Sequence, residues 1–218
     1  MKFLFKLRLH AVSRFSKKGA LIAFILACGG CVETVNSSLP KAVSLLSGNQ
    51  EIIISAPKGF CVDQRLASKF KGSTTLFVID CVKVNDVTGV TTARRPVSAI
   101  LTATVIDFKS SDLTSIDRME ELLIKKPGIN FLSRANTNAL LKVHEIETKK
   151  GFLFFLIEQR DSDINVKRSN YFWRVFFFIE GRIISMTASN FSDDFNSQKK
   201  LKKLIAEFAK NTLAANIK

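Results

Sequence analysis

Residues 152–157 read Phe-Leu-Phe-Phe-Leu-Ile, and residues 172–179 read Phe-Trp-Arg-Val-Phe-Phe-Phe-Ile. Both runs have the length of a β-strand and are apolar at nearly every position. A strand in a sheet with one solvent-exposed face would instead alternate between apolar and polar residues. We therefore expect these strands to lie in a sheet that is covered on both faces. Residues 149–151 and 180–182, each with a glycine, predict tight hairpin turns beside them.

The rest of the chain supplies further strands and the helices that would cover them. Runs rich in β-branched and aromatic residues predict strands at 52–54, 60–62, 74–84, 97–108, 139–147, 152–160, 171–179 and 183–189. Apolar residues at helical spacing predict helices over 114–125 and 196–214. The first of these helices would bury Ile116, Met119, Leu122 and Leu123. Asp63 is expected to cap a helical turn over 64–70, and another helical turn is expected at 41–46.

The predicted fold class is therefore α+β. It is a mostly antiparallel sheet with helices on both faces, which is an α/β/α sandwich. A sandwich of this kind would bury the apolar strands from both sides.

The first 27 residues have the composition of a signal peptide. They contain six basic and no acidic residues, and they end in the apolar run Ala-Leu-Ile-Ala-Phe-Ile-Leu-Ala at 20–27. A basic stretch followed by a short apolar stretch and small residues is typical of secretory signal peptides. Because a membrane-spanning helix needs roughly 20 apolar residues, this run is too short to span a bilayer stably. We therefore expect export from the bacterial cytoplasm.

The end of this run, Ile25-Leu26-Ala27-Cys28, resembles the lipobox of bacterial lipoproteins. The resemblance implies diacylglycerol on the sulfur of Cys28, cleavage before Cys28 and acylation of the new amino terminus. Two lipid signals give stable membrane anchoring. By the same resemblance, Gly29 implies delivery to the outer membrane, facing the periplasm. Three alternatives stay open: processing at Cys31, ordinary cleavage near Gly30 that yields a soluble periplasmic protein, and an uncleaved anchor.

These features divide the chain into three parts. Residues 1–27 are the predicted lipoprotein signal peptide, residues 28–50 a polar lipidated tether, and residues 51–218 a globular α+β domain. The formal net charge of the whole chain is +14. Without the six basic residues of the signal peptide, 27 basic and 19 acidic residues remain, which is a net charge of +8. This charge allows attraction to anionic lipid headgroups, and no nucleic-acid-binding motif accompanies it.

Four cysteines are present, at positions 28, 31, 61 and 81. If Cys28 carries lipid, Cys31 is left single and Cys61 can pair with Cys81, as an oxidising compartment favours. Closing a loop of about 20 residues would stabilise the domain by about 3 kcal/mol. Two cysteines without a cluster of histidines argue against a metal site.

Residues 59–63, Gly-Phe-Cys-Val-Asp, and residues 77–81, Phe-Val-Ile-Asp-Cys, contain the two cysteines of the domain. Near the end of the chain come residues 173–175, Trp-Arg-Val, and residues 181–185, Gly-Arg-Ile-Ile-Ser. Together these stretches resemble a group of uncharacterised alphaproteobacterial lipoproteins. The element order over residues 51–216 also resembles the PsbP-like α-β-α sandwich. This resemblance implies a binding or assembly module, and it carries no functional residues over.

Few residues suggest chemistry. His144 is the single histidine after the signal peptide, and it lies on a predicted strand. Catalysis by serine or cysteine needs a nucleophile, a base and an orienting group in one pocket, and nothing in the sequence marks such a set. Asp161 with Asp163 and Asp193 with Asp194 could act as acids or metal ligands. Aspartate is also favoured in turns, where it bonds the backbone.

Basic and aromatic residues give the remaining candidates. Arg94 and Arg95 are candidate contacts for an anionic ligand or headgroup, and Lys167-Arg168 form a second basic pair. Solvated loop charges are the alternative interpretation of both pairs. Tyr171 and Trp173 alternate on one strand face, where core packing competes with ligand stacking as an explanation.

The sequence therefore favours a non-catalytic binding or assembly module of the cell envelope, held to a membrane by its lipid anchor. An envelope protein is the expected partner, and no nucleic acid, cofactor or metal is predicted. Two alternatives stay open: a soluble periplasmic solute-binding protein, and an envelope hydrolase with an unrecognised site. An exposed apolar patch would support a binding module, whereas a concave pocket with convergent polar groups would support a hydrolase.

Overall fold

The computed structural model describes residues 39–70, 73–81, 99–106, 115–125, 128, 130–133, 140–160, 169–191 and 193–217. All of them belong to one compact unit, Ser37–Lys218.

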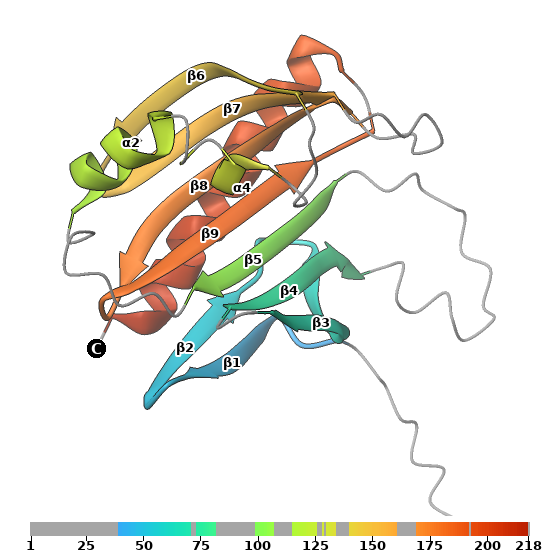
Figure 1. Ribbon diagram of the computed structural model, residues 1–218. Coiled ribbons are helices and arrows are strands. Elements are labelled where there is room, and N and C mark those ends of the chain that lie inside the picture. The colour runs from blue at the N-terminus through green and yellow to red at the C-terminus, as the bar shows by residue number, and fades with distance from the viewer. Residues whose placement is uncertain are drawn as a thin grey trace, which may run out of the picture. The chain divides into compact units, whose positions relative to one another are not determined.

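A seven-stranded antiparallel sheet dominates this unit (Figure 1). Its strands follow the spatial order β3-β4-β5-β9-β8-β7-β6. Their bounds are β3 Phe60–Phe70, β4 Ser73–Asp80, β5 Ile100–Ile106, β6 Leu140–Lys149, β7 Phe152–Arg160, β8 Tyr171–Ile179 and β9 Arg182–Ser189. A separate two-stranded sheet pairs β1 (Ala42–Ser47) with β2 (Gln50–Ser55). The described helices with defined bounds are α2 (Ile116–Ile124), α4 (Phe195–Asn216) and the 3₁₀ turn η2 (Asn130–Leu132).

Two tight turns join neighbouring strands of this sheet as the sequence predicts. Lys150 and Gly151 have φ values of 53° and 79° between β6 and β7, and Glu180 and Gly181 have 50° and 72° between β8 and β9. Two consecutive positive φ angles match the right-handed twist of the strands that the turn connects. The second turn fixes the register of β8 against β9 from Ile179 opposite Arg182 onward.

One face of the sheet is covered by α4 and by the β1–β2 hairpin. Leu201, Ile205 and Phe208 of α4 are buried in the same cluster as Trp173 and Val175 of β8. Burial of each such apolar side chain contributes about 1.5–3 kcal/mol. Side chains near the end of α4 also satisfy the outer edge of β2, because Thr212 and Asn216 hydrogen-bond its backbone.

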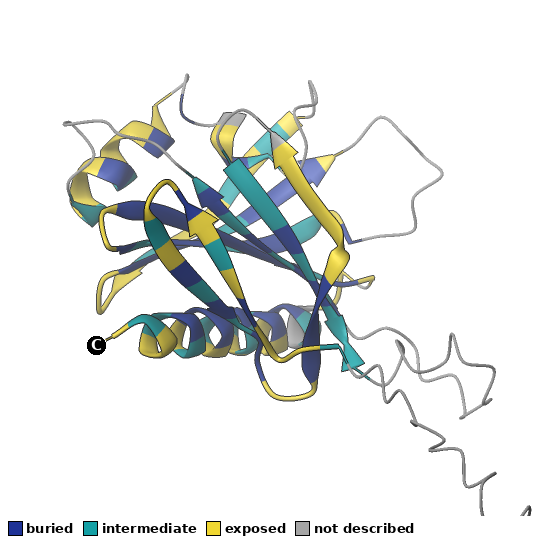
Figure 2. Ribbon diagram, turned by 90° about the horizontal axis from the view of Figure 1, so that it is seen from below, coloured by how far each residue is buried: buried dark blue, intermediate teal, exposed yellow. Residues whose placement is uncertain are grey.

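The other face carries a second, smaller core. Met119 and Leu123 of α2 and Leu132 of η2 are buried there with Phe155 of β7 and Phe172 of β8, among other residues. Ser115 caps α2, since its side chain accepts a hydrogen bond from the backbone N–H of Arg118. Figure 2 shows α2 and α4 on opposite sides of the sheet.

The predicted fold class, a PsbP-like α/β/α sandwich, is wrong. The described chain is mostly β, with a nine-residue helix on one face and a 22-residue helix on the other. The apolar runs in β7 and β8 are buried on both faces, but much of their cover comes from the β1–β2 hairpin and η2 rather than from layers of helices. The apolar pattern of a strand indicates that both of its faces are buried, but it does not indicate which elements bury them.

Two local predictions also fail. Residues 64–70 belong to β3 and not to a helical turn, and Asp63 accepts hydrogen bonds from the backbone N–H and the guanidinium of Arg65 instead of capping a helix. Pairing with β4 on both sides of an irregularity between Asp63 and Ser68 holds this segment extended. Residues 41–46 are not a helical turn either. They lie largely in β1, so the folded region begins ahead of the expected domain start at Glu51.

Candidate interaction surface

The predicted disulfide is present and joins Cys61 to Cys81. The two Cα atoms are 5.0 Å apart, and the S–S bond length is 2.04 Å. The bridge links the start of β3 to the end of β4, where the backbone N–H of Cys81 also donates to the carbonyl of Gly59 at 3.0 Å. This confirms the pairing expected of these two cysteines.

Several candidate residues lie outside the described residues. They are Cys28 and Cys31, the arginines Arg94 and Arg95, the carboxylates Asp161 and Asp163, and the pair Lys167 and Arg168. Their predicted roles stay predictions.

The second carboxylate pair has structural roles. Asp194 caps α4, because its Oδ1 accepts from the backbone N–H of Ser197 at 2.8 Å. Asp193 accepts from the backbone N–H of Asn170 at 3.0 Å and from the hydroxyl of Ser169. Across the part of the chain that the structure describes, no group of three or more His, Cys, Asp or Glu residues could hold a metal ion. The turn interpretation of these aspartates is therefore the one that the geometry supports.

His144 lies on β6 and forms an ion-pair network rather than a catalytic set. Its Nε2 is 2.8 Å from Oε2 of Glu158, and Arg160 donates from Nε to Oε1 of the same carboxylate at 2.7 Å. The Glu158 side chain is 8% exposed. Hydrogen bonds from His144 and Arg160 hold the pKa of Glu158 below its ordinary value, although burial opposes them. Because both carboxylate oxygens have partners, Glu158 is not poised to accept a proton from a substrate.

Trp173 is a core residue, as one of the two interpretations of the sequence held. It is 2% exposed, and its Nε1–H donates to the carbonyl of Gln198 on α4 at 3.1 Å. The ammonium of Lys202 lies 4.5 Å from the centre of the indole ring and binds Glu145 and Glu147 of β6. Burial lowers the pKa of Lys202, but the hydrogen bonds to the two glutamates outweigh it and raise the pKa overall. This cluster attaches α4 to the sheet.

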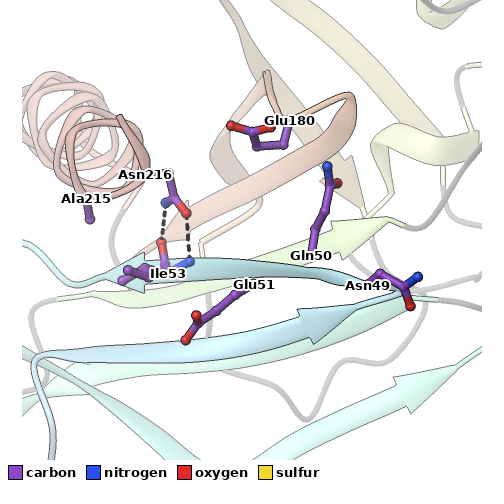
Figure 3. Close-up of a pocket in the computed structure, with 7 residues that line it drawn as sticks. All are labelled: Asn49, Gln50, Glu51, Ile53, Glu180, Ala215 and Asn216. Atoms are coloured by element: carbon purple, nitrogen blue, oxygen red, sulfur yellow. Dashed lines mark hydrogen bonds between the residues drawn. The ribbon is translucent and has the colours of Figure 1, made fainter. Parts of the chain in front are cut away.

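A hollow of about 430 Å³ lies where the β1–β2 turn meets the end of α4 (Figure 3). Its lining consists of Asn49, Gln50, Glu51, Ile53, Glu180, Ala215 and Asn216. Two of these residues are acidic and three carry amides, so the lining mixes polar and apolar groups. It contains no hydroxyl, thiol or imidazole that could act as a nucleophile beside a base. The hollow therefore lacks the set of groups that a hydrolase of the serine or cysteine type needs.

The face covered by α2 presents large apolar side chains to solvent. Leu122 and Ile124 of α2 are 43% and 50% exposed, Phe131 of η2 is 69% exposed and Ile146 of β6 is 38% exposed. Ile146 lies opposite Phe155, whose side chain belongs to the core under α2, so both point to this face. We call these four residues the α2 surface.

Neighbouring contacts hold the α2 surface in place. The guanidinium of Arg174 donates to the carbonyl of Phe131 at 2.5 Å, and the next residue, Leu132, is fully buried. On α2, Glu121 binds both Arg118 and Lys125, at 3.1 and 2.6 Å. The backbone at Phe131 is thus held to β8, and charged residues lie beside Leu122 and Ile124 on α2.

The sequence did not identify this surface. Its helical pattern placed Leu122 and Leu123 on the same buried face, whereas adjacent residues on a helix are about 100° apart and only Leu123 is buried. Phe131 gave no periodic signal, because it lies in a three-residue turn. The one indication in the sequence was the 100° separation of Leu122 from Leu123, which implies that a narrow buried face cannot include both side chains.

No described helix combines the length and the apolar character that crossing a membrane requires.

Comparisons with known proteins give little beyond these observations. No protein-family model matches the chain, and no curated protein matches it. Among solved structures, the crystal structure of the extracellular domain of PknH from Mycobacterium tuberculosis matches with a TM-score of 0.28 and 5% sequence identity. The match covers 63% of this chain and 64% of that one. A TM-score this low does not show a shared fold, so no family assignment follows.

Proposed function

We propose that the protein is a lipid-anchored module of the cell envelope that binds a protein partner through the α2 surface. The observation that carries this proposal is the exposure of four large apolar side chains, Leu122, Ile124, Phe131 and Ile146, on one face of the sheet. Large apolar side chains that are exposed on one face, beside charged residues, are a feature of protein interaction sites. Aromatic residues such as Phe131 are enriched at the centres of such interfaces.

The contacts that hold the backbone at Phe131 favour binding. Arg174 fixes the backbone at Phe131, and Leu132 is buried beside it. A side chain that is already positioned loses less conformational entropy when a partner covers it. Phe131 therefore suits the role of an anchor residue.

The cellular address comes from the sequence and is supported by the disulfide. A signal peptide and lipobox ending at Cys28 would place the domain outside the cytoplasm, where thiols are oxidised. The bridge between Cys61 and Cys81 fits that compartment. Gly29 after the lipidated cysteine would direct the protein to the outer membrane, facing the periplasm.

The experiment compares two variants. One loses exposed apolar side chains from the α2 surface, and the other loses one from β1. The double variant Leu122→Ser/Phe131→Ser removes two residues of the α2 surface. Leu46→Ser is the matched control, because Leu46 is 75% exposed on β1. Complexes are crosslinked in cells. They are then purified by an affinity tag on this protein, and their masses are compared by gel electrophoresis.

The proposal expects one crosslinked complex of defined mass with the wild-type protein and with Leu46→Ser, and its loss from the double variant. Phe131→Ser alone should change the free energy of unfolding by less than about 0.5 kcal/mol, because substitutions of exposed side chains usually have small effects on stability. A complex that survives the double variant at full yield would contradict the proposal.

A further inference from the structure

The side of α4 that faces away from the sheet carries a row of lysines. Lys199, Lys200, Lys203 and Lys210 are all exposed. At about 100° per residue they fall within a sector of roughly 100°, and Lys199 and Lys210 lie about 16 Å apart along the axis. We call these four residues the lysine row. By the same spacing, the buried residues Leu201, Ile205 and Phe208 lie on the other side of the helix.

The lysine row carries charge that the described part of the protein leaves unbalanced. No ion pair joins any of its four members to another described residue, whereas Lys202, off the row, binds Glu145 and Glu147. Glu207 is the single acidic residue of α4, and it falls inside the same sector of the helix. One of its oxygens accepts from the backbone N–H of Lys58 at 3.0 Å. This exposed side of α4 therefore carries four positive charges and one negative charge, along a helix whose opposite side is fixed in the core.

We propose that the lysine row docks the domain on an anionic phospholipid surface. Lysine is a compact, strongly hydrated point charge, which suits a diffuse layer of phosphate headgroups. The row contains no arginine, whose planar fork would recognise a carboxylate or phosphate in two hydrogen bonds, and no aromatic ring on which a base could stack. These features favour a lipid surface over an acidic protein or a single-stranded nucleic acid.

The lysine row and the α2 surface lie on opposite faces of the sheet. Docking through α4 would therefore leave the α2 surface directed away from the membrane and open to a partner. All four members of the lysine row are charged, so binding should be electrostatic. Because salt screens the attraction between exposed charges, binding should weaken at high salt. The two surfaces are independent, and lipid binding can succeed or fail without affecting the partner proposed for α2.

The test uses residues 37–218, which hold both cores, the disulfide and every described strand and helix. Removal of the signal region separates binding by the lysine row from binding by an acyl anchor. Folding of each variant is checked by circular dichroism and thermal unfolding. Binding is measured by cosedimentation with vesicles of phosphatidylglycerol and phosphatidylcholine, and with vesicles of phosphatidylcholine alone, at low and at high salt.

The triple variant Lys199→Gln/Lys203→Gln/Lys210→Gln is compared with Lys41→Gln/Lys69→Gln/Lys142→Gln. Both sets change the net charge equally, and the control lysines are exposed and lie off α4. Each lysine near an anionic surface contributes roughly fivefold to partitioning, so the α4 variant should bind phosphatidylglycerol vesicles roughly a hundredfold more weakly. The control should lose far less.

Three results would overturn the proposal. The first is equal loss in both triple variants, which would show an effect of net charge alone. The second is binding to pure phosphatidylcholine vesicles that high salt does not reduce. The third is tighter binding of the wild-type domain to single-stranded nucleic acid or to an acidic polypeptide than to phosphatidylglycerol, lost in the α4 variant, which would assign the row to another polyanion.

Discussion

The side chain of Asn216 pairs with the backbone of Ile53 as a neighbouring strand would (Figure 3). Its Oδ1 accepts from the N–H of Ile53 at 2.9 Å, and its Nδ2 donates to the carbonyl of Ile53 at 2.7 Å. Thr212, one helical turn earlier, does the same for Ser55, at 3.1 and 3.3 Å. An unpaired strand edge can recruit another chain, so α4 protects the edge of β2 that β1 leaves open.

Replacing Asn216 by leucine should leave the N–H and carbonyl of Ile53 without partners. We expect a loss of about 1–3 kcal/mol in the free energy of unfolding, because each of the two lost hydrogen bonds contributes about 0.5–1.5 kcal/mol. The amide of Ile53 should also exchange with solvent faster, as measured by NMR in deuterium oxide. Asn49→Leu, in the exposed turn of the hairpin, is the control. Unchanged exchange at Ile53 would contradict the bracing role of Asn216.

Reduction of the bridge between Cys61 and Cys81 should lower the free energy of unfolding by about 3 kcal/mol, because the bridge restricts the unfolded chain over a loop of about 20 residues. Urea unfolding with and without reductant measures the difference. The double variant Cys61→Ala/Cys81→Ala should behave like the reduced protein and show no further response to reductant. If reductant still destabilises the double variant, the effect does not come from the bridge between Cys61 and Cys81, which would contradict its predicted contribution.

Glu158→Gln tests the ion-pair network at the end of β7. His144 and Arg160 bind this carboxylate, and its cross-strand neighbours are Lys142 of β6 and Tyr171 of β8. Because the folded protein holds the pKa of Glu158 below its unfolded value, the carboxylate stabilises the fold above its unfolded pKa. That stabilisation is lost as the pH falls through the folded pKa.

The expected result is a variant that is less stable than the wild type at neutral pH, with a difference that shrinks as the solution is acidified below the range in which glutamate ordinarily titrates. Unfolding curves at a series of pH values measure it, and Glu180→Gln in an exposed turn is the control. A difference that is constant across this range would rule out the ionised carboxylate as its source.

Lipidation at Cys28 predicts a defined mass. Protein purified from membranes of a bacterial host should begin at Cys28 and carry acyl chains, and it should gain two hydrogens on reduction of the bridge between Cys61 and Cys81. Cys28→Ala should abolish acylation and accumulate the unprocessed chain. An unacylated product that begins after Cys28 would contradict the anchor and support a soluble periplasmic protein.

Most strands of the main sheet and its two tight hairpin turns followed from the sequence, whereas β1, most of β3 and the layers around the sheet did not. The apolar runs of β7 and β8 and the glycine at 181 are local signals, and local signals decide strands and turns. Pairing across the sheet is not local: Ile100 of β5 lies opposite Ser189 of β9, and their partnership is visible only in the folded chain. The same applies to residues 64–70, whose pairing with β4 overrides a sequence that resembles a helical turn.

The candidate surface was harder to predict than the fold. A hydrophobic pattern shows which residues are apolar, and it gives no measure of which apolar residues stay uncovered. Leu122 and Phe131 differ from the buried Leu123 and Leu132 beside them only through the positions of α2 and η2 on the sheet. The disulfide was predictable, because the predicted export left one pair of cysteines in the domain.

Site-specific photocrosslinking from position 131 in intact cells tests the central claim most directly. A photoreactive phenylalanine analogue replaces Phe131 in one strain and the exposed Leu46 in another. The proposal predicts one adduct of defined mass from position 131, formed with an envelope protein other than a second copy of this chain, and no such adduct from position 46. The absence of an adduct from position 131 at normal protein levels, or the same adduct from both positions, would contradict it.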